Sequence, residues 1–355
     1  MSAGLSLQKK IIFSVITTVA ALAAINGAVV LQDKQKYGVT SGEKEAMYEQ
    51  TPSGRRVLKA GATMQGTASK VRTNAYGFRG PELLDPKPEN GFRIWVVGGS
   101  TTFDVYAPSD AHTWPALVGQ SLAEAHPDRV VEVINAGIPG EVIAGNLEDF
   151  KRHAAAIQPD LLVYYHGPND LRDIRFGGPP PPSGALEKEF ALLRAARGVV
   201  NKRYPQLPDE WSEARLSSHD LNEMIRRIDL LLEVAQQRGV PVVMANHAFQ
   251  HIDGKTGTES LSEVGEICVL MQMAPDNVVH MFRDYNNLVK GMAERKGMPF
   301  ADVRGAVPGD ARYWGDALHF SAAGSVLAAA AVTEAIEGGG FFTKAEAQSG
   351  TATAR

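Results

Sequence analysis

The sequence predicts an α/β fold built around a mainly parallel five-stranded sheet, preceded by a hydrophobic helix at the N-terminus. Short apolar, β-branched runs alternate along the chain with segments of helical periodicity, and this alternation is typical of βαβ units. The first three predicted strands each lead into a polar loop that contains glycine. Right-handed crossovers would bring these loops to one edge of the sheet. We place the strands at residues 94–97, 130–134, 160–165, 240–245 and 298–303.

The length and composition fit a globular protein with additional segments. The 355 residues suffice for one large α/β domain and more. A hydrophobic content of 44% and a charged content of 21% are those of an ordinary globular protein. The formal net charge of -4 gives no reason to expect nucleic-acid binding. The oligomeric state is left open.

The N-terminal segment is apolar enough to enter a membrane. Two lysines precede an uncharged run, residues 11–31, which is long enough to cross a bilayer core of roughly 30 Å as a helix. A cleaved signal peptide usually has an apolar core of only about 7–15 residues, so residues 1–31 favour an uncleaved anchor. Small residues at 20–24 leave cleavage and secretion open, and a buried core helix is a third interpretation. The basic N-terminal side predicts a single pass through the inner membrane, with the main domain in the periplasm of a Gram-negative cell.

The stretch between this segment and the first strand is expected to be mostly irregular. Residues 32–90 contain few periodic apolar positions and many Gly, Lys, Glu and Thr residues, which predicts a linker that then packs on the domain. Near its end, Tyr76 and Phe78 are apolar anchors, and Gly77 and Gly80 permit tight turns. A surface arm docked on the sheet explains this stretch better than a direct contact with substrate.

Helical periodicity recurs between the strands and after the last one. One apolar stripe, 221–232, has Ser218 as a candidate N-cap and Gly239 as the residue after its C-cap. The main domain is expected to span 91–340, followed by a flexible tail at 341–355. The other predicted helices cover residues 115–125, 144–157, 278–295 and 321–336.

An insertion at about 174–217 interrupts the alternation of strands and helices. Its prolines at 179–182 favour a stiff, extended segment, although disorder is a competing interpretation. A short helix is expected at 185–196. Loops beside an active site often set specificity, so the insertion is a candidate specificity element.

A candidate nucleophile, Ser100, closely follows the first strand. Ligands in open α/β sheets bind outside the carboxyl ends of the strands, and Gly98 and Gly99 leave space around this side chain. A phosphate loop is a weaker interpretation, because no Walker-type lysine precedes the hydroxyl. The G-x-S-x-G nucleophile elbow also fails, because its last position is Thr102.

A serine nucleophile needs a base, a group that orients the base, and donors for the oxyanion. Asp316 and His319 are spaced so that one turn can place the carboxylate beside the imidazole. A surface Asp–His pair would explain this spacing at least as often. The candidate oxyanion donors are the N–H groups of Ser100 and Gly137 and the side-chain amide of Asn169, which follow the first three strands.

Other reactive side chains carry less weight. His166, close to Asn169, is a candidate substrate contact. His247 and His251 have the spacing of a zinc-binding H-E-x-x-H helix, but the glutamate is missing and the segment before them is predicted to be a strand, so no metal site is expected. Cys268 is the sole cysteine, and its apolar surroundings favour a buried structural role over a nucleophilic one.

Four short motifs follow one another along the chain: Gly-Gly-Ser-Thr at 98–101, Asn-Ala-Gly at 135–137, Gly-Pro-Asn-Asp at 167–170 and Asp-Ala-Leu-His at 316–319. Taken in this order, they resemble the sequence blocks of the SGNH hydrolases, the GDSL esterase/lipase superfamily. The resemblance runs from about Phe92 to Ile336 with the insertion as a gap, and residues 74–82 also resemble the lead-in of some bacterial members.

The resemblance implies a three-layer α/β/α sandwich of the flavodoxin-like kind. It also implies roles for the candidate residues: Ser100 as the nucleophile, His319 as its base and Asp316 as the group that orients the base. Ser100, Gly137 and Asn169 would then form the oxyanion hole. Neither a metal nor an organic cofactor is implied.

The sequence departs from the motif that gives this family its name. That motif is Gly-Asp-Ser-Leu, and here Gly99 and Thr101 replace the Asp and the Leu. The departure leaves the subfamily, and with it the substrate, open.

The residues, the apolar segment and the resemblance together predict a membrane-anchored, extracytoplasmic serine esterase. Its acyl ester substrate would be an O-acyl ester of a cell-envelope carbohydrate or a lipid. An O-acyltransferase, in which a sugar hydroxyl replaces water at the same triad, is the first alternative. A non-catalytic envelope-binding protein that retains the fold is the second.

Overall fold

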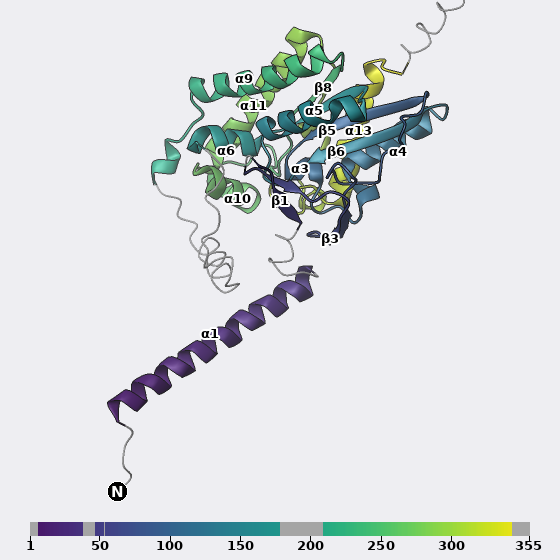
Figure 1. Cartoon of the computed structure of the whole chain (residues 1–355). Coiled ribbons are helices and arrows are strands. Elements are labelled where there is room, and N and C mark those ends of the chain that lie inside the picture. The colour runs from purple at the N-terminus through teal and green to yellow at the C-terminus, as the bar shows by residue number, and fades with distance from the viewer. Residues whose placement is uncertain (1–5, 38–46, 53, 178–208, 343–355) are drawn as a thin grey trace, which may run out of the picture. The chain divides into compact units, whose positions relative to one another are not determined.

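The computed structural model describes residues 6–37, 47–52, 54–177 and 209–342 (Figure 1). The helix predicted at 185–196, the proline run and nearly all of the tail lie outside the described residues. Contacts divide the chain into two units. The first comprises residues 1–46 and 180–206, and the second comprises residues 47–179 and 207–355.

The first unit contains one described helix, α1 (Leu7–Tyr37), of 31 residues. Its segment Ile11–Ala28 has a mean hydropathy of 2.0, and none of this segment is buried. The large side chains of Phe13 and Ile16 are 65% and 60% exposed. This exposure argues against a buried core helix and leaves two interpretations, a membrane anchor and a signal sequence.

The second unit is organised around a parallel five-stranded sheet, which confirms the predicted α/β fold. The strand order is β6-β5-β7-β8-β9, and every neighbouring pair is parallel. All eight residues of β5 are buried, as expected for a strand covered on both faces. Gly98, at the end of β5, lies opposite Gly137 of β6 and Tyr165 of β7, so three loops start at one edge. The strands are β5 (Gly91–Gly98), β6 (Val130–Gly137), β7 (Leu161–Tyr165), β8 (Val242–Ala245) and β9 (Phe300–Ala301).

Helices cover both faces of the sheet and complete a three-layer α/β/α sandwich (Figure 1). The side chains of β5 alternate between two apolar cores, with Trp95 and Val97 in the first and Ile94 and Val96 in the second. The first core also contains apolar residues of α5, α9, α10 and α11, and the second contains those of α4 and α13. These helices are α4 (Trp114–Ala125), α5 (Ile143–Ile157), α9 (Ser218–Gln237), α10 (Leu261–Met271), α11 (Pro275–Lys296) and α13 (Ala322–Gly338).

Two of the longer helices differ from the expectation. The N-cap of α9 is Ser217 rather than Ser218, because Ser217 Oγ accepts the N–H of Asp220 while the Asp220 carboxylate accepts the N–H of Ser217. Helix α10 was not predicted. It buries Cys268, and this burial raises the pKa of the thiol to about 12, which agrees with a structural role. The short helices are α3 (Ser100–Phe103), α6 (Pro168–Phe176) and α12 (Val303–Ala306), with 3₁₀ turns at Asp110–His112, Asp209–Ser212, Gly257–Ser260 and Ala311–Tyr313.

The stretch before β5 has more regular structure than the expected linker and arm. Met47, Leu58 and Val71 pack with Phe103 and Ile138 in a third apolar cluster. From Met47 onward this stretch is therefore part of the folded unit. It contains two antiparallel hairpins, β1 (Tyr48–Gln50) with β2 (Arg56–Leu58), and β3 (Thr63–Gln65) with β4 (Lys70–Arg72).

The end of this stretch docks on the sheet at the anchor expected from the sequence. Phe78 is buried and packs edge-on against Trp95, with ring centroids 5.1 Å apart. The next residue, Arg79, forms a β-bridge to Asn135 in β6. Its guanidinium is buried and donates to the carbonyl oxygen of Phe103, in the helix that begins at Ser100.

Candidate active site

Ser100 lies at a sharp turn between β5 and α3, and glycine makes this turn possible. A Cβ atom on Gly98 would lie 2.4 Å from the Tyr165 carbonyl oxygen and 2.0 Å from Thr102 Oγ1. The N–H of Gly98 donates to Asn146 Oδ1 at 2.7 Å, which fixes the end of the strand. Ser100 is the first residue of α3, where N–H groups have no acceptor within the helix.

The structure brings Ser100, His319 and Asp316 together. His319 Nε2 lies 2.7 Å from Ser100 Oγ, and His319 Nδ1 lies 2.8 Å from both carboxylate oxygens of Asp316. Asp316 Oδ1 also accepts the N–H groups of Leu318 and His319 at 2.9 Å, so the turn orients the carboxylate. Because the carboxylate faces Nδ1, that nitrogen carries the proton, and Nε2 is left to accept the hydroxyl proton.

The Asp316–His319 pair is only partly buried. The two side chains remain 23% and 19% exposed. Burial alone would raise the pKa of Asp316, but the hydrogen bond and charge of His319, with the two backbone N–H groups, hold it below its ordinary value. Asp316 is therefore ionised at neutral pH and keeps the imidazole in one tautomer.

The other predicted oxyanion donors lie beside this serine. A Cβ on Gly137 would be 2.9 Å from the Gly99 carbonyl oxygen and 2.2 Å from a backbone nitrogen of α3, so only glycine allows this approach. The N–H of Gly137 donates to Asn135 Oδ1 at 3.1 Å. Asn169, in the first turn of α6, donates through Nδ2 to the carbonyl oxygen of Glu141 at 3.0 Å.

Gly99, which stands where the name motif has Asp, is closely coupled to Asn169. A Cβ on Gly99 would lie 2.6 Å from Asn169 Nδ2 and 3.4 Å from the Glu141 carbonyl oxygen. A side chain at this position would displace the Asn169 amide from its place in this structure. The departure from the motif thus leaves room for this position of Asn169.

His166 does not fit its expected role as a substrate contact. Its side chain is 1% exposed, and both ring nitrogens face protein groups. Nε2 lies 2.8 Å from Asn146 Oδ1, and Nδ1 lies 3.0 Å from Asp170 Oδ2. The prediction rested on proximity to Asn169 along the chain, but the imidazole points into the protein interior.

Residues 96–262 match the model of the GDSL-like lipase/acylhydrolase family. The match includes Ser100, Gly137 and Asn169 and ends before Asp316 and His319. This part of the chain is a domain of that family. It is a carboxylic ester hydrolase of the GDSL type.

Several solved structures are similar to this GDSL-type hydrolase at low sequence identity. A variant of an acetyl xylan esterase from Geobacillus stearothermophilus is 18% identical, with 69% of this chain and 94% of that chain covered and a TM-score of 0.45. The lipase/acylhydrolase from Enterococcus faecalis is 17% identical, with coverages of 70% and 96% and a TM-score of 0.43. A GDSL-like lipase from Bacteroides thetaiotaomicron is 14% identical, with coverages of 72% and 92% and a TM-score of 0.40. Curated protein sequences gave no match.

Two buried polar residues to which the sequence motifs assign no role hold the hydrolase site together. Asn146 on α5 accepts the N–H of Gly98 and donates through Nδ2 to the carbonyl oxygen of Ala136 at 2.9 Å. Asp170 accepts the N–H of Ile143 at 2.9 Å and thereby ties α6 to the start of α5. Each residue joins segments that are far apart in the sequence, so its role becomes visible only in the fold.

His247 lies directly behind the turn that carries the serine. Its Nε2 is 3.5 Å from Thr101 Oγ1, and its ring stacks on Tyr165 with centroids 5.0 Å apart. Burial lowers the pKa of His247 to about 3, so the ring is neutral. Among the residues that the structure describes, no group of three or more His, Cys, Asp or Glu side chains is arranged to hold a metal ion.

A hollow of about 820 Å³ lies where β8 and β9 end, with Asn246, His251 and Arg283 among its lining residues. None of the triad or oxyanion residues lines it. The loop beside this hollow touches the triad turn, because the N–H of Gln250 donates to the carbonyl oxygen of Ala317 at 2.9 Å. The hollow is thus a neighbour of the candidate active site and not the site itself.

Proposed function

We propose that this GDSL-type domain is a serine esterase in which Ser100 is the nucleophile, His319 the general base and Asp316 the group that orients the base. The observation that carries the proposal is the position of the His319 ring. Its Nε2 lies 2.7 Å from Ser100 Oγ while its Nδ1 faces Asp316. This is the arrangement that a serine needs to lose its proton as it attacks a carbonyl carbon.

The reaction proceeds in two halves. Ser100 Oγ attacks the acyl carbonyl carbon while its proton moves to His319 Nε2. The imidazolium, stabilised by ionised Asp316, then protonates the leaving alcohol, and an acyl-serine remains. Water attacks this ester with the same base, and the second tetrahedral intermediate collapses to the free acid and Ser100.

The oxyanion is stabilised by three donors around Gly99. These are the N–H of Ser100, the N–H of Gly137 and the second N–H of the Asn169 amide, whose first N–H is held by Glu141. The N–H of Gly137 must be shared with Asn135 Oδ1 or released by rotation of that side chain.

We place the substrate among O-acyl esters of a cell-envelope carbohydrate or a lipid, with α1 as a membrane anchor. The apolar, exposed segment Ile11–Ala28 supports this location. In cells that express the full chain, the protein should stay in the membrane after carbonate extraction and should keep residues 1–31, as measured by intact mass. A mature chain that lacks these residues would make α1 a signal sequence instead.

The mechanism is tested with a panel of esters from acetyl to long-chain acyl groups. Ser100→Ala should lower kcat by about 10⁴-fold or more on every ester that the wild type cleaves. Ser109→Ala is a matched control, because Ser109 Oγ also lies 2.7 Å from an imidazole nitrogen, that of His112, but in an exposed contact that includes no triad residue. It should keep the wild-type rate. Activity of Ser100→Ala at the wild-type rate would overturn the mechanism.

A further inference from the structure

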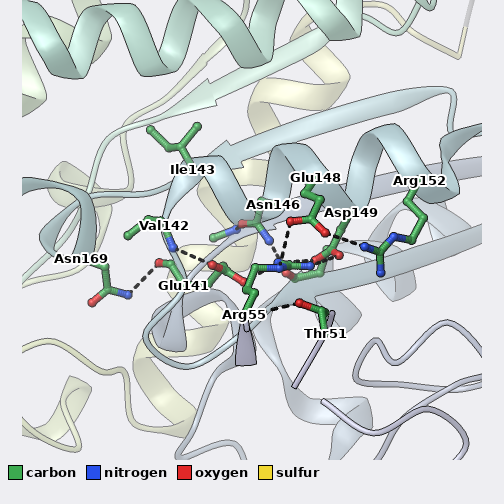
Figure 2. Close-up of polar contacts among 12 residues, drawn as sticks. Thr51, Arg55, Glu141, Val142, Ile143, Asn146, Glu148, Asp149, Arg152 and Asn169 are labelled. Carbon is green, nitrogen blue, oxygen red and sulfur yellow. Dashed lines mark hydrogen bonds and ion pairs between the residues drawn. The ribbon is translucent and has the colours of Figure 1, made fainter. Parts of the chain in front are cut away.

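Arg55 directly precedes β2 in the first hairpin. Its side chain is inserted among carboxylates beside the loop between β6 and α5 (Figure 2). Its side chain is only 14% exposed. Nη1 lies 2.7 Å from Glu141 Oε2, and both Nη1 and Nη2 donate to the carboxylate of Asp149 on α5. The turn that presents Arg55 is closed by reciprocal bonds with Thr51, at 2.8 and 3.1 Å. The turn therefore holds the backbone of Arg55, and the carboxylates hold its guanidinium.

Glu141 connects this arginine to the loop between β6 and α5. Its side chain folds back over the start of α5, where a Cβ on Gly145 would lie 2.0 Å from Glu141 Oε1. Oε1 also accepts the N–H of Val142 at 3.2 Å, and the N–H of Glu141 donates to the Ile138 carbonyl oxygen at 2.9 Å. The backbone of Glu141 is thus fixed by its own side chain and by the turn.

The carbonyl oxygen of Glu141 is the acceptor that orients Asn169. Asn169 Nδ2 donates one N–H to it at 3.0 Å, as Figure 2 shows, and the other N–H of the amide remains for an oxyanion. A donor is effective only when it is held close to the productive geometry. Any shift of the Glu141 carbonyl oxygen would therefore change where Asn169 points.

We infer that Arg55 is a positioning residue for the oxyanion donor Asn169 and acts through Glu141. The inference rests on the proposed function, because it assigns Asn169 the donor role. Without Arg55, the carboxylates of Glu141 and Asp149, which are 7% and 6% exposed, would face each other without a cation. Relief of that repulsion would move the loop that carries Glu141.

The charge environment of Glu141 supports this dependence on Arg55. Burial raises the pKa of Glu141, and the charge of Arg55 is the strongest influence that opposes the rise. Loss of Arg55 would favour protonation of Glu141 or movement of its side chain toward water. Either change alters the start of α5 next to Asn169.

The experiment is a double-mutant cycle measured as kcat and KM on the full chain in detergent, with the melting temperature recorded for each variant. Asn169→Ala should lower kcat by about 10²–10³-fold with little change in KM. Arg55→Ala should lower kcat by about 10–100-fold, and Arg55→Lys should recover part of this loss. The double variant should match Asn169→Ala within about threefold, because Arg55 acts through that residue.

Arg152 provides the matched control. It lies on the same helix as Asp149 and pairs with Glu148, but its side chain is 46% exposed and contacts neither Glu141 nor Asn169 (Figure 2). Arg152→Ala should keep kcat within about twofold of the wild type. If Arg55→Ala does not fold, Glu141→Gln replaces it in the cycle, since it removes the charge and keeps the shape.

The outcomes separate the inference from the proposed function. If Asn169→Ala is impaired but Arg55→Ala or its substitute keeps the wild-type kcat, only the inference is overturned. The same follows if the two losses multiply in the double variant, because that result means a role independent of Asn169. If Asn169→Ala itself keeps full kcat, its donor role in the proposed function is overturned together with the inference.

Discussion

Two His–Asp pairs in this protein each place an imidazole nitrogen beside a carboxylate, one with a hydrogen bond between them and one without, in different surroundings. In the surface pair, His319 Nδ1 faces Asp316 at 2.8 Å, and in the interior pair, His166 Nδ1 faces Asp170 at 3.0 Å. The surface pair is about one-fifth exposed, whereas the interior pair is 1% and 0% exposed. The interior pair flanks Asn169 along the chain, and the surface pair lies beside Ser100 in space. Because both pairs stand near residues of the site, neither spacing nor residue type separates a candidate catalytic pair from a structural one.

The partner of the second ring nitrogen makes the difference. His319 Nε2 meets the hydroxyl of Ser100, which can give up a proton. His166 Nε2 meets Asn146 Oδ1, which must be the amide oxygen because it also accepts the N–H of Gly98 while Asn146 Nδ2 donates to a carbonyl. His166 Nε2 therefore carries a proton and cannot serve as a base. The same imidazole–carboxylate unit is suited to catalysis in one place and to holding loops together in the other.

The largest expected effect is the loss of turnover when the surface pair is broken. His319→Ala should lower kcat by about 10⁴–10⁶-fold, since among the described residues no other side chain is hydrogen-bonded to Ser100 Oγ and placed to take its proton. The urea midpoint should change little, because the side chain is partly exposed. Ester hydrolysis measures the kcat, and urea unfolding measures the midpoint. A kcat within tenfold of the wild type would remove His319 from the proposed mechanism.

Breaking the interior pair should have the opposite pattern. His166→Ala leaves the fully buried Asp170 without its imidazole, and we expect a loss of about 3–5 kcal/mol in the free energy of unfolding. The kcat per folded molecule should stay within about threefold. Urea unfolding measures the stability loss, and activity measured well below the unfolding transition gives the kcat. The exposed His112→Ala is the control, and its change in the free energy of unfolding should be near zero. A folded, stable His166→Ala protein that lacks activity would contradict the comparison.

The elements that the sequence reveals are those whose apolar residues are regularly spaced and buried. Strand β5 is such a case, because all of its residues are buried. The hairpin strands β1 to β4 have three residues each, too few to show an alternation. Helix α10 was missed because Glu263 lies on its buried face, where Lys255 pairs with it, and interrupts the apolar stripe.

The site shows the same limit. A motif after the first strand pointed to Ser100 and a motif just before the last helix pointed to His319, but their contact joins residues 219 positions apart and needs the fold. His166 was assigned wrongly, because position along the chain does not tell which way a side chain turns after a strand. Arg55 lies in a polar stretch that reads as solvated, and its carboxylate partners come 86 and 94 positions later. Long-range ion pairs of this kind leave no local periodicity.

A third carboxylate, Asp104, separates the effect of burial from that of a charged partner and should give the smallest effect. Its side chain is 1% exposed, and Oδ2 accepts hydrogen bonds from two neutral groups, the N–H of Trp114 at 2.8 Å and the hydroxyl of Ser325 at 2.7 Å. Burial raises the pKa of Asp104 from 3.8 to about 6, whereas that of paired Asp316 is lowered. Between pH 3.8 and about 6 the folded protein binds more protons than the unfolded chain, so the contribution of Asp104 to stability falls as the pH rises through this window and is constant above it.

Asp104→Asn removes this titration and keeps the side-chain shape. The difference in unfolding free energy between the variant and the wild type should shift in favour of the variant by about 2–3 kcal/mol from pH 4 to pH 7, at about 1.4 kcal/mol per pKa unit. Urea unfolding across this range measures it. An offset that is the same at every pH reflects the new amide, so only the slope tests the idea. A flat difference for Asp104→Asn would mean that its two neutral hydrogen bonds suffice to keep a buried carboxylate ionised without a cation in contact.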